Sequence, residues 1–512
     1  MAAEKAIKGY MGIGEPGGGE QLINLPEQGG QGGGGSDSPW LIDVDYYVPE
    51  LEIGKNGRQF EVLAWPAEGR LSGMVFDLDK CLYGGERGQE YLRAGSEGEI
   101  EAIAAGLGVS AEEAYQRVGN RRHELEESKG GKTTLTETVL SLGFSPEWWN
   151  KIRNECYAPE NFLEPDPELV AALAKVGEHY RVAVASNSPH DVVKRALRQL
   201  GLSDESMRRM HIFGPDDLGV GKPDPAFYWR VAENMGLSPK ECLSVGDRVE
   251  ADGIPALQAG MGAVIVSGPE GVKDLVNDYL MHNGGVLAKE FDLSDYLREV
   301  HEPGKVKVIG LTGRAGAGKT TRARDMLMIG EKLNIPVVIL GLDSFFIKSS
   351  KGRKEWLEEE GIADEERRRR EDQDNWWDFD KARWALGVLK RGDRLFMEGV
   401  YDRNKGSELV GTVDITPDPD RGLVVIFEGV GISHLSEMMD DVVFIAAHPN
   451  ERKGRLLGRD HELRVGEAAK KRFRITQTYE AGHFATNGGR VTRVLENSSG
   501  DLVEVPPAFP FV

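Results

Sequence analysis

The chain has 512 residues with 84 acidic and 63 basic side chains, which gives a formal net charge of −21. This length exceeds one ordinary hydrophobic core, and at about 150 residues per domain it predicts two or three domains. The acidic charge argues against a broad surface for nucleic acid, because phosphate backbones bind clustered Lys and Arg.

Cysteine usage and hydropathy indicate a cytoplasmic protein. Cys81, Cys156 and Cys242 are far apart and provide neither a disulfide framework nor a metal-ligand spacing. No apolar run approaches the roughly 18 residues that span a bilayer, and the N-terminus lacks a signal-peptide pattern. We expect a soluble, cytoplasmic protein with small-molecule substrates and no membrane partner, and we consider a homodimer.

The first 70 residues carry few chemical signals. Residues 1–38 are rich in glycine and poor in apolar anchors. Such a segment buries too little apolar surface to offset its chain entropy, so we expect a disordered tail. Alternating apolar residues in Leu51–Ile53 and Phe60–Leu63 predict short strands, and we assign residues 39–70 to a small β appendage.

An α/β domain is expected over residues 71–283. Apolar, strand-like runs alternate there with amphipathic stretches, which is the pattern of a parallel sheet. Between Gly84 and Pro165 the pattern becomes helical and predicts a helical cap inserted at about residues 85–165. The expected strands are Met74–Leu78, Arg181–Ala185, Cys242–Val245 and Gly262–Val266.

Polar groups follow several of these strands, at the edge where ligands of open α/β sheets bind. Taken singly they are ordinary, because a lone D-x-D is commonly a surface turn and a lone Lys before Pro is commonly a loop charge. The groups are Asp77, Asp79, Ser186, Asn187, Lys222, Asp247 and Asp252. Taken in this order they resemble the haloacid dehalogenase superfamily of phosphatases over about residues 71–270.

The resemblance implies phosphoryl transfer to a protein carboxylate. A carboxylate can attack phosphorus if a metal and a cation offset the repulsion between like charges. By the pattern of that family, Asp77 would be the nucleophile and Asp79 the general acid and base for the leaving oxygen. Ser186 and Asn187 would hydrogen-bond the phosphoryl group, and Lys222 would neutralise it.

The same resemblance implies a Mg²⁺ site. Asp247 would complete it with Asp77 and the backbone carbonyl of Asp79, and Asp252 would be a secondary ligand or would orient Lys222. The alternative is a degenerate phosphatase fold kept as a scaffold.

Three further segments look like the pyrimidine 5′-nucleotidase branch of the superfamily. In this chain Lys80-Cys81 replaces the commoner Gly-Thr after the second Asp. Trp148, Trp149 and Tyr157 in the cap either stack on a base or form the cap core, and aromatic residues at helical spacing are more often core. The segments are Phe76–Tyr83, Gly131–Leu135 and Pro165–Leu169.

The run Val308–Thr321 is the most informative motif of the chain, because a strand-like segment, G-x-x-x-x-G-K-T and a helix-compatible segment follow one another. The glycines let backbone N–H groups surround an anion, Lys319 adds charge toward the β- and γ-phosphates, and Thr320 offers a hydroxyl to Mg²⁺. The motif predicts ATP binding. The expected ATP-binding residues are Gly313, Gly316, Gly318, Lys319, Thr320 and Thr321.

A second α/β unit is therefore expected over residues 305–512, after a linker at 284–304. The charged run Glu358–Asp374 is expected to be a solvated helix. The predicted fold class is α/β with two doubly wound parallel-sheet domains, a capped haloacid dehalogenase-like domain followed by a P-loop kinase domain. The expected strands of the second domain are Val306–Leu311, Val337–Leu340, Leu423–Phe427 and Asp441–Ala446.

After the P-loop, a D-S-F-F element begins at Asp343, and F-D, Y-D and E-G-V elements follow in order. These elements resemble the uridine kinase and phosphoribulokinase family over about residues 305–490. The resemblance implies that Asp343 is the general base for the acceptor hydroxyl, and that Thr320 and Glu428 are the groups on the side of Mg²⁺.

Arginines that recur after residue 450 would form a lid over the transferring phosphate. We expect these arginines, Arg455 and Arg459 first among them, to stabilise the charge of the transferring phosphate together with Lys319. Asp380, Tyr401 and Arg403 would line the acceptor pocket. A Trp-Trp-Asp-Phe-Asp run stands where uridine kinases usually have His-Pro-Asp-Ala-Phe-Asp, and pantothenate kinases and other small-molecule kinases share the scaffold.

The sequence thus predicts a Mg²⁺-dependent phosphomonoesterase fused to an ATP-dependent kinase, both acting on small metabolites such as nucleosides, nucleotides or sugars. One alternative is a polynucleotide kinase-phosphatase for end repair, which the acidic charge disfavours. Another is an ATP-binding regulatory protein with an inactive phosphatase unit.

Overall fold

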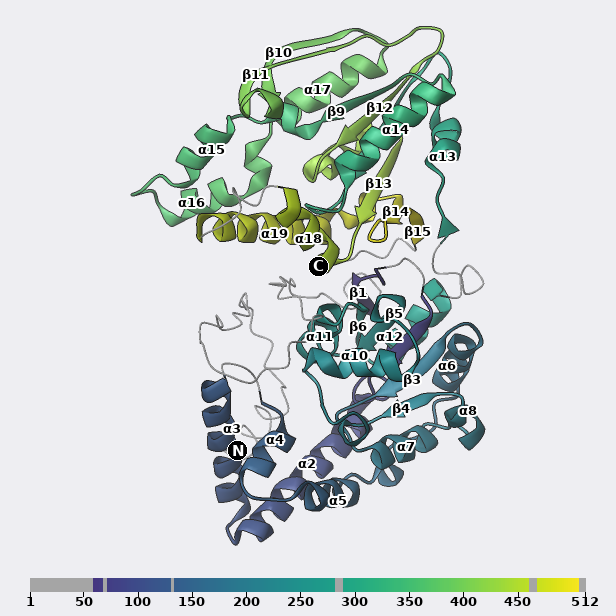
Figure 1. Cartoon of the computed structure of the whole chain (residues 1–512), viewed down its shortest axis with the longest axis vertical. Coiled ribbons are helices and arrows are strands. Elements are labelled where there is room, and N and C mark those ends of the chain that lie inside the picture. The colour runs from purple at the N-terminus through teal and green to yellow at the C-terminus, as the bar shows by residue number, and fades with distance from the viewer. Residues whose placement is uncertain (1–58, 68–70, 130–132, 281–288, 460–466, 506–512) are drawn as a thin grey trace. The chain divides into compact units, whose positions relative to one another are not determined.

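A computed structural model describes residues 59–67, 71–129, 133–280, 289–459 and 467–505 (Figure 1). The tail expected at residues 1–38 and the strand expected at Leu51–Ile53 lie outside these residues. The chain divides into two compact units, of which residues 72–285 make up most of the first and residues 286–512 most of the second. Both units are α/β, so the predicted fold class is confirmed.

The first unit is built on a six-stranded sheet in the order β1-β6-β5-β2-β3-β4. Strands β6, β5, β2, β3 and β4 pair in parallel. β1 joins the edge of this sheet with four of its five residues buried, so the expectation of a separate β appendage is wrong for this stretch. The strands are β1 (Phe60–Ala64), β2 (Gly73–Phe76), β3 (Arg181–Ala185), β4 (His211–Phe213), β5 (Cys242–Gly246) and β6 (Gly262–Val266).

Helices of the first unit either alternate with these strands or form the cap. The cap helices pack on one another and gather away from the strands (Figure 1). Thr134 begins one of them through a capping box with Glu137. The cap helices are α2 (Gly85–Leu107), α3 (Ala111–Lys129), α4 (Leu135–Ser141) and α5 (Pro146–Cys156), and the main helices near the sheet are α6 (Pro167–His179), α7 (His190–Gln199), α10 (Pro225–Asn234), α11 (Ile254–Gln258) and α12 (Pro269–Asp274).

The cap has its own apolar core. Trp149 is buried there with Ile103 and Val139, while Trp148 is packed against the same core and stacks on Phe144 at 4.2 Å between ring centroids. Burial excludes Trp149 as a stacking surface for a substrate. Of the two alternatives, the structure supports the one that helical spacing favours, in which Trp149 belongs to the cap core.

The second unit contains a seven-stranded sheet in the order β7-β15-β14-β13-β8-β12-β9. The five strands from β14 to β9 pair in parallel, β15 pairs antiparallel with β14, and β7 pairs antiparallel with β15. A separate hairpin is formed by β10 (Leu395–Asp402) and β11 (Glu408–Ile415). The sheet strands are β7 (Lys289–Glu290), β8 (Val306–Thr312), β9 (Val337–Gly341), β12 (Leu423–Glu428), β13 (Asp441–Ala446), β14 (Arg493–Glu496) and β15 (Val503–Val505).

The structure corrects the expectation of a linker at residues 284–304. Its described part holds β7 and helix α13 (Leu293–Val300), which packs against α14. Tyr296 and Leu297 are buried in the core of the second unit. The helix is short and mostly polar, with only these two side chains buried, so its sequence looks like a connection.

Six further α-helices belong to the described part of the second unit. The charged run contains α16, where Arg370 pairs with Glu366 four residues earlier, so the predicted helical pairing is present. Among the described residues, no helix combines the length and the apolar composition needed to cross a bilayer. The helices are α14 (Lys319–Leu333), α15 (Ser350–Leu357), α16 (Asp364–Glu371), α17 (Phe379–Lys390), α18 (Pro449–Arg459) and α19 (Glu467–Asn487).

Candidate functional site

The carboxyl ends of β2, β3 and β5 bring the expected phosphatase residues together. β2 lies between β5 and β3, and the chain adds later strands on both sides of it, so this edge is a topological switch point where ligands bind. Asp77 follows β2 directly, and its N–H donates to the Val245 carbonyl at 2.8 Å. Ser186 follows β3 and Asp247 follows β5. Residues up to 170 positions apart in the chain thus share one edge.

Lys222 is the cation at the centre of this site. Its Nζ donates to Asp77 Oδ1 and to Asp252 Oδ1, each at 2.6 Å, and all three side chains are buried. Burial alone lowers the pKa of Lys222, but the carboxylates of Asp252 and Asp77 outweigh it and hold the pKa above its ordinary range. Lys222 is therefore a fixed positive charge between two carboxylates.

Even with Lys222, the site has a surplus of negative charge. Burial raises the pKa of Asp247 to about 6, and Asp252 adds to the rise while Arg248 and Lys80 oppose it. Asp77, Asp247 and Asp252 each offer one carboxylate oxygen, and these atoms lie within 4.8 Å of one another. Converging carboxylate oxygens are the donors that suit Mg²⁺, so these residues fit that ion.

Asp79 is held by three hydroxyl groups. Tyr83 Oη donates to Asp79 Oδ1 at 2.5 Å, while Ser186 Oγ and Ser188 Oγ donate to Oδ2 at 3.4 Å. These bonds fix the carboxyl group two residues after Asp77, where an acid for a leaving oxygen is needed.

Asn187 has a different set of contacts from those expected of a phosphate ligand. Its Oδ1 accepts from the Lys222 N–H at 2.8 Å, and its Nδ2 donates to the Lys222 carbonyl at 3.0 Å. In the structure Asn187 therefore positions the backbone of Lys222. A bond from Asn187 to a phosphoryl group remains a prediction.

The loop that the sequence predicts to bind phosphate, called the phosphate loop below, joins β8 to α14 in the second unit. Gly313, Gly316 and Gly318 have φ of 140°, 81° and 103°, a region that side chains rarely adopt, which explains the glycines. The loop ends on the first amides of α14, which have no acceptor within the helix and attract anions. Lys319 Nζ donates to the Gly313 and Arg314 carbonyls at 2.6 and 3.1 Å.

The groups expected beside Mg²⁺ and the acceptor hydroxyl meet at the ends of β12 and β9. Thr320 Oγ1 donates to Glu428 Oε2 at 3.0 Å. Asp343 follows β9, whose Gly341 pairs with Glu428. Asp343 is accessible to solvent, yet the protein around its carboxylate raises its pKa, and Arg353, Arg403 and Lys319 oppose this.

For one of the expected acceptor residues, Asp380, the prediction is wrong. Asp380 is 99% exposed and pairs with Arg383 at 3.2 Å on the surface of α17, so it does not line a pocket. Helix α17 begins at Phe379 with Asp378 as its cap, and this phase turns Asp380 to solvent. Tyr401 is instead partly buried, with its Oη 2.9 Å from Ser350 Oγ.

Of the two arginines expected to lead a lid, Arg455 contacts the phosphate loop. Arg455 donates to the carbonyls of Ala317 at 3.2 Å, Asn497 at 2.6 Å and Ser498 at 2.9 Å, so in the structure it supports the loop instead of reaching over it. The side chain of Arg459 lies outside the described residues. Glu480 of α19 accepts from the Ala315 N–H at 2.7 Å, a contact the sequence did not indicate.

A haloacid dehalogenase-like hydrolase family model matches residues 71–260. The YhcW protein of Bacillus subtilis (strain 168), named as a candidate phosphatase, is 40% identical over 198 residues, which cover 38% of this chain and 83% of YhcW. The chain belongs to the haloacid dehalogenase-like hydrolases. A glyceraldehyde 3-phosphate phosphatase of Methanothermobacter thermautotrophicus is 26% identical over 45% of this chain and 99% of its own length.

A solved structure matches a comparable share of the chain. It is described as that of a possible uridine kinase from Bacillus stearothermophilus, and it is 18% identical over 40% of this chain and 97% of its own, with a TM-score of 0.26.

This haloacid dehalogenase-like hydrolase has a buried ion pair in its cap that the sequence analysis missed. Arg153 Nε donates to Glu99 Oε1 at 2.9 Å, and Arg153 Nη1 donates to the Asn187 carbonyl at 2.7 Å. Arg153 thereby ties helix α5 of the cap to the loop that positions Lys222. Nothing in the local sequence separates Arg153 from a surface arginine, because its partners are 54 and 34 residues away.

Proposed function

We propose that the first unit is a Mg²⁺-dependent phosphomonoesterase acting on a small metabolite. The observation that carries this proposal is the buried arrangement in which Lys222 pairs with Asp77 and Asp252 while Asp247 lies within 4.8 Å. One cation, a nucleophilic carboxylate and a further oxygen-ligand set are the parts that phosphoryl transfer to a carboxylate needs. Mg²⁺ bound by these oxygens would offset the repulsion between Asp77 and a phosphate dianion.

The reaction proceeds in two displacements. An oxygen of Asp77 attacks phosphorus, the bond to the leaving oxygen breaks, and Asp79 gives that oxygen a proton. Asp79 then removes a proton from a water molecule that attacks the aspartyl-phosphate, releasing inorganic phosphate and restoring Asp77. Lys222 balances the charge of the phosphoryl group in both steps.

We infer a second activity, an ATP-dependent kinase, from the other unit. The supporting observation is the bond between Thr320 and Glu428 at the end of the phosphate loop, with Asp343 on the neighbouring strand end. Asp343 would take the proton of an acceptor hydroxyl as its oxygen attacks the γ-phosphorus of ATP, with ADP as the leaving group. Lys319 and the amides of the loop would hold the phosphates.

Small metabolites are the substrates we propose for both units. The relatives named above include a phosphatase for glyceraldehyde 3-phosphate, a three-carbon ester. The aromatic side chain Trp149 is buried in the cap core, so it offers no platform for a base. A short polyol or sugar phosphate fits these facts better than a nucleotide does.

A substrate panel tests both activities in the full chain. One arm measures phosphate release from three- to six-carbon sugar phosphates, glycolate phosphate and nucleotides with Mg²⁺. The other measures phosphate transfer from ATP to the matching hydroxyl compounds and to 5′-hydroxyl oligonucleotides. Turnover of small molecules in each arm is expected. Transfer to oligonucleotides alone would favour end repair, and ATP binding without turnover in either arm would favour a regulatory protein.

A further inference from the structure

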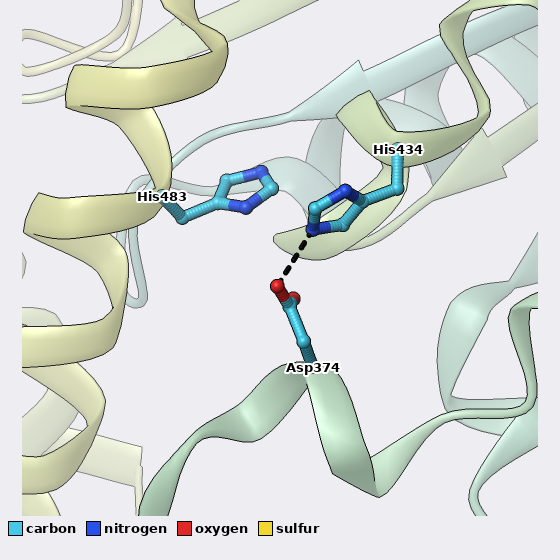
Figure 2. A group of neighbouring side chains, drawn as sticks. All are labelled: Asp374, His434 and His483. Atoms are coloured by element: carbon cyan, nitrogen blue, oxygen red, sulfur yellow. Dashed lines mark hydrogen bonds and ion pairs between the residues drawn. The ribbon is translucent and has the colours of Figure 1, made fainter.

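A cluster of two histidines and one aspartate lies in the second unit and has no role in the two reactions above. Asp374 belongs to a short helix at Gln373–Trp376, His434 to another at Gly431–Met438, and His483 to α19. Figure 2 shows the three side chains converging from these separate segments. The residues are 49 to 109 positions apart in the chain, so only the fold brings them together.

The distances suit a shared ion. His434 Nε2 lies 2.9 Å from Asp374 Oδ2, and one donor atom from each of the three residues lies within 4.8 Å of the others. Two donors bound to one ion at about 2.1 Å and the tetrahedral angle are about 3.4 Å apart. The cluster reaches this spacing with side-chain movements of about 1 Å.

The ion pair between Asp374 and His434 does not account for the buried imidazole of His483. Asp374 and His434 pair with each other. His483 is only 5% exposed, and within the described part of the chain its imidazole makes no hydrogen bond shorter than 3.4 Å. Its Nδ1 lies 3.4 Å from Tyr479 Oη and from Asn487 Nδ2, and its Nε2 has no partner among the described residues. Buried polar groups are normally satisfied, so a poorly bonded imidazole beside a carboxylate calls for a ligand.

The surroundings resemble an outer shell for a metal ion. Tyr479 Oη donates to Asp374 Oδ1 at 2.6 Å, so it orients the carboxylate while Oδ2 faces the histidines. The rings of Phe379 and Phe484 lie against His434 and His483 with centroids 5.0 and 5.2 Å apart. Such hydrogen bonds and apolar walls fix ligand orientation in metal sites.

We propose that Asp374, His434 and His483 bind a divalent transition-metal ion of the zinc type. Two imidazoles and one carboxylate are the donor set of Zn²⁺, Co²⁺ and Fe²⁺, whereas Mg²⁺ prefers oxygen ligands alone. The ion is therefore distinct from the Mg²⁺ that accompanies ATP. It joins α19 to two other segments, and α19 also carries Glu480, which holds the Ala315 amide of the phosphate loop.

Cobalt titration of the full chain tests the proposal without depending on activity. The protein is stripped of metal and titrated with Co²⁺ in excess Mg²⁺, which fills the carboxylate sites. We expect one equivalent of Co²⁺ to bind, with the visible absorption of nitrogen-ligated cobalt, and to slow amide exchange in α19. No binding, or binding with the weak spectrum of an all-oxygen site, overturns the proposal.

Matched variants locate the ion. His434→Gln is expected to weaken Co²⁺ binding at least about tenfold, at a position whose side chain is 30% exposed. His123→Gln, an exposed residue of the cap, is the control and keeps wild-type affinity. Circular dichroism of both variants checks that they fold. Equal Co²⁺ affinity in folded His434→Gln and the control would place the ion elsewhere and overturn the proposal.

Discussion

The Lys222→Met substitution separates a phosphatase centre from an ordinary buried ion pair. Methionine keeps the length of the apolar stem and removes the charge. At 2.6 Å and an effective dielectric constant of 20, Lys222 attracts each of Asp77 and Asp252 by about 6 kcal/mol. Desolvation cancels much of this, and removing one partner of a buried pair costs about 3–5 kcal/mol. We therefore expect Lys222→Met to lower the free energy of unfolding by about 3–5 kcal/mol at pH 7 in the absence of Mg²⁺.

The loss should depend on pH. Burial raises the pKa of Asp77 above its ordinary 3.8, Lys222 opposes this rise, and Asp252 and other carboxylates add to it. Without Lys222 the pKa of Asp77 rises further. A carboxyl group whose pKa is raised by folding contributes most below its unfolded pKa, and that contribution disappears as the pH rises through its folded pKa. The deficit of the variant is therefore largest near pH 7 and shrinks as the pH falls toward 4.

Hydrogen exchange resolved by peptide measures this in the full chain, because it reports β2 and β5 separately from the second unit. Lys175→Met, at an exposed position of α6, is the control and should change exchange little. Two results would refute the electrostatic account of the site. One is that Lys222→Met leaves exchange in β2 and β5 unchanged, and the other is that it reduces their protection equally at pH 7 and pH 4.5.

Three further outcomes are expected. Lys80 has φ of 61°, so Lys80→Gly should be more stable than Lys80→Ala by about 1 kcal/mol in urea unfolding, and equal stabilities would argue against strain there. Arg153→Met leaves Glu99 buried without its charged partner and should destabilise the cap by about 3 kcal/mol or more in thermal unfolding. Adding Glu99→Gln should recover part of this loss, and additive losses would contradict the pairing. The pKa of Asp247 is raised to about 6, so the apparent Mg²⁺ affinity of the phosphatase should fall below pH 6, by up to about tenfold per pH unit, and a flat affinity from pH 7 to 5 would contradict its role as a ligand.

The phosphatase centre could be predicted from the sequence because its residues obey a rule of topology. Asp77, Ser186 and Asp247 each follow an apolar parallel strand, and such strand ends meet at one edge. Lys222 lies in a loop, and only the order of the motifs indicated its place. The phosphate loop was predictable for a similar reason, since Lys319 and Thr320 follow a strand and begin a helix.

Other features depend on contacts that no local pattern records. Asp380 was misassigned because a shift of two residues along α17 turns a side chain from the interior to solvent. Asp374, His434 and His483 come from three segments with no characteristic spacing, so their convergence appears only in the fold. Helix α13 was taken as a linker because two buried side chains in eight residues are a weak signal.

Paired activity measurements on two variants test the central claim, that the chain has two independent sites for phosphoryl transfer. Asp77→Asn removes the nucleophile of the first unit, and Lys319→Ala removes the loop cation of the second. With phosphate release and transfer from ATP assayed on the same preparations, Asp77→Asn should lose the first activity and keep the second, and Lys319→Ala should do the reverse. Loss of both activities in either folded variant, or retention of phosphate release by Asp77→Asn, would contradict the account.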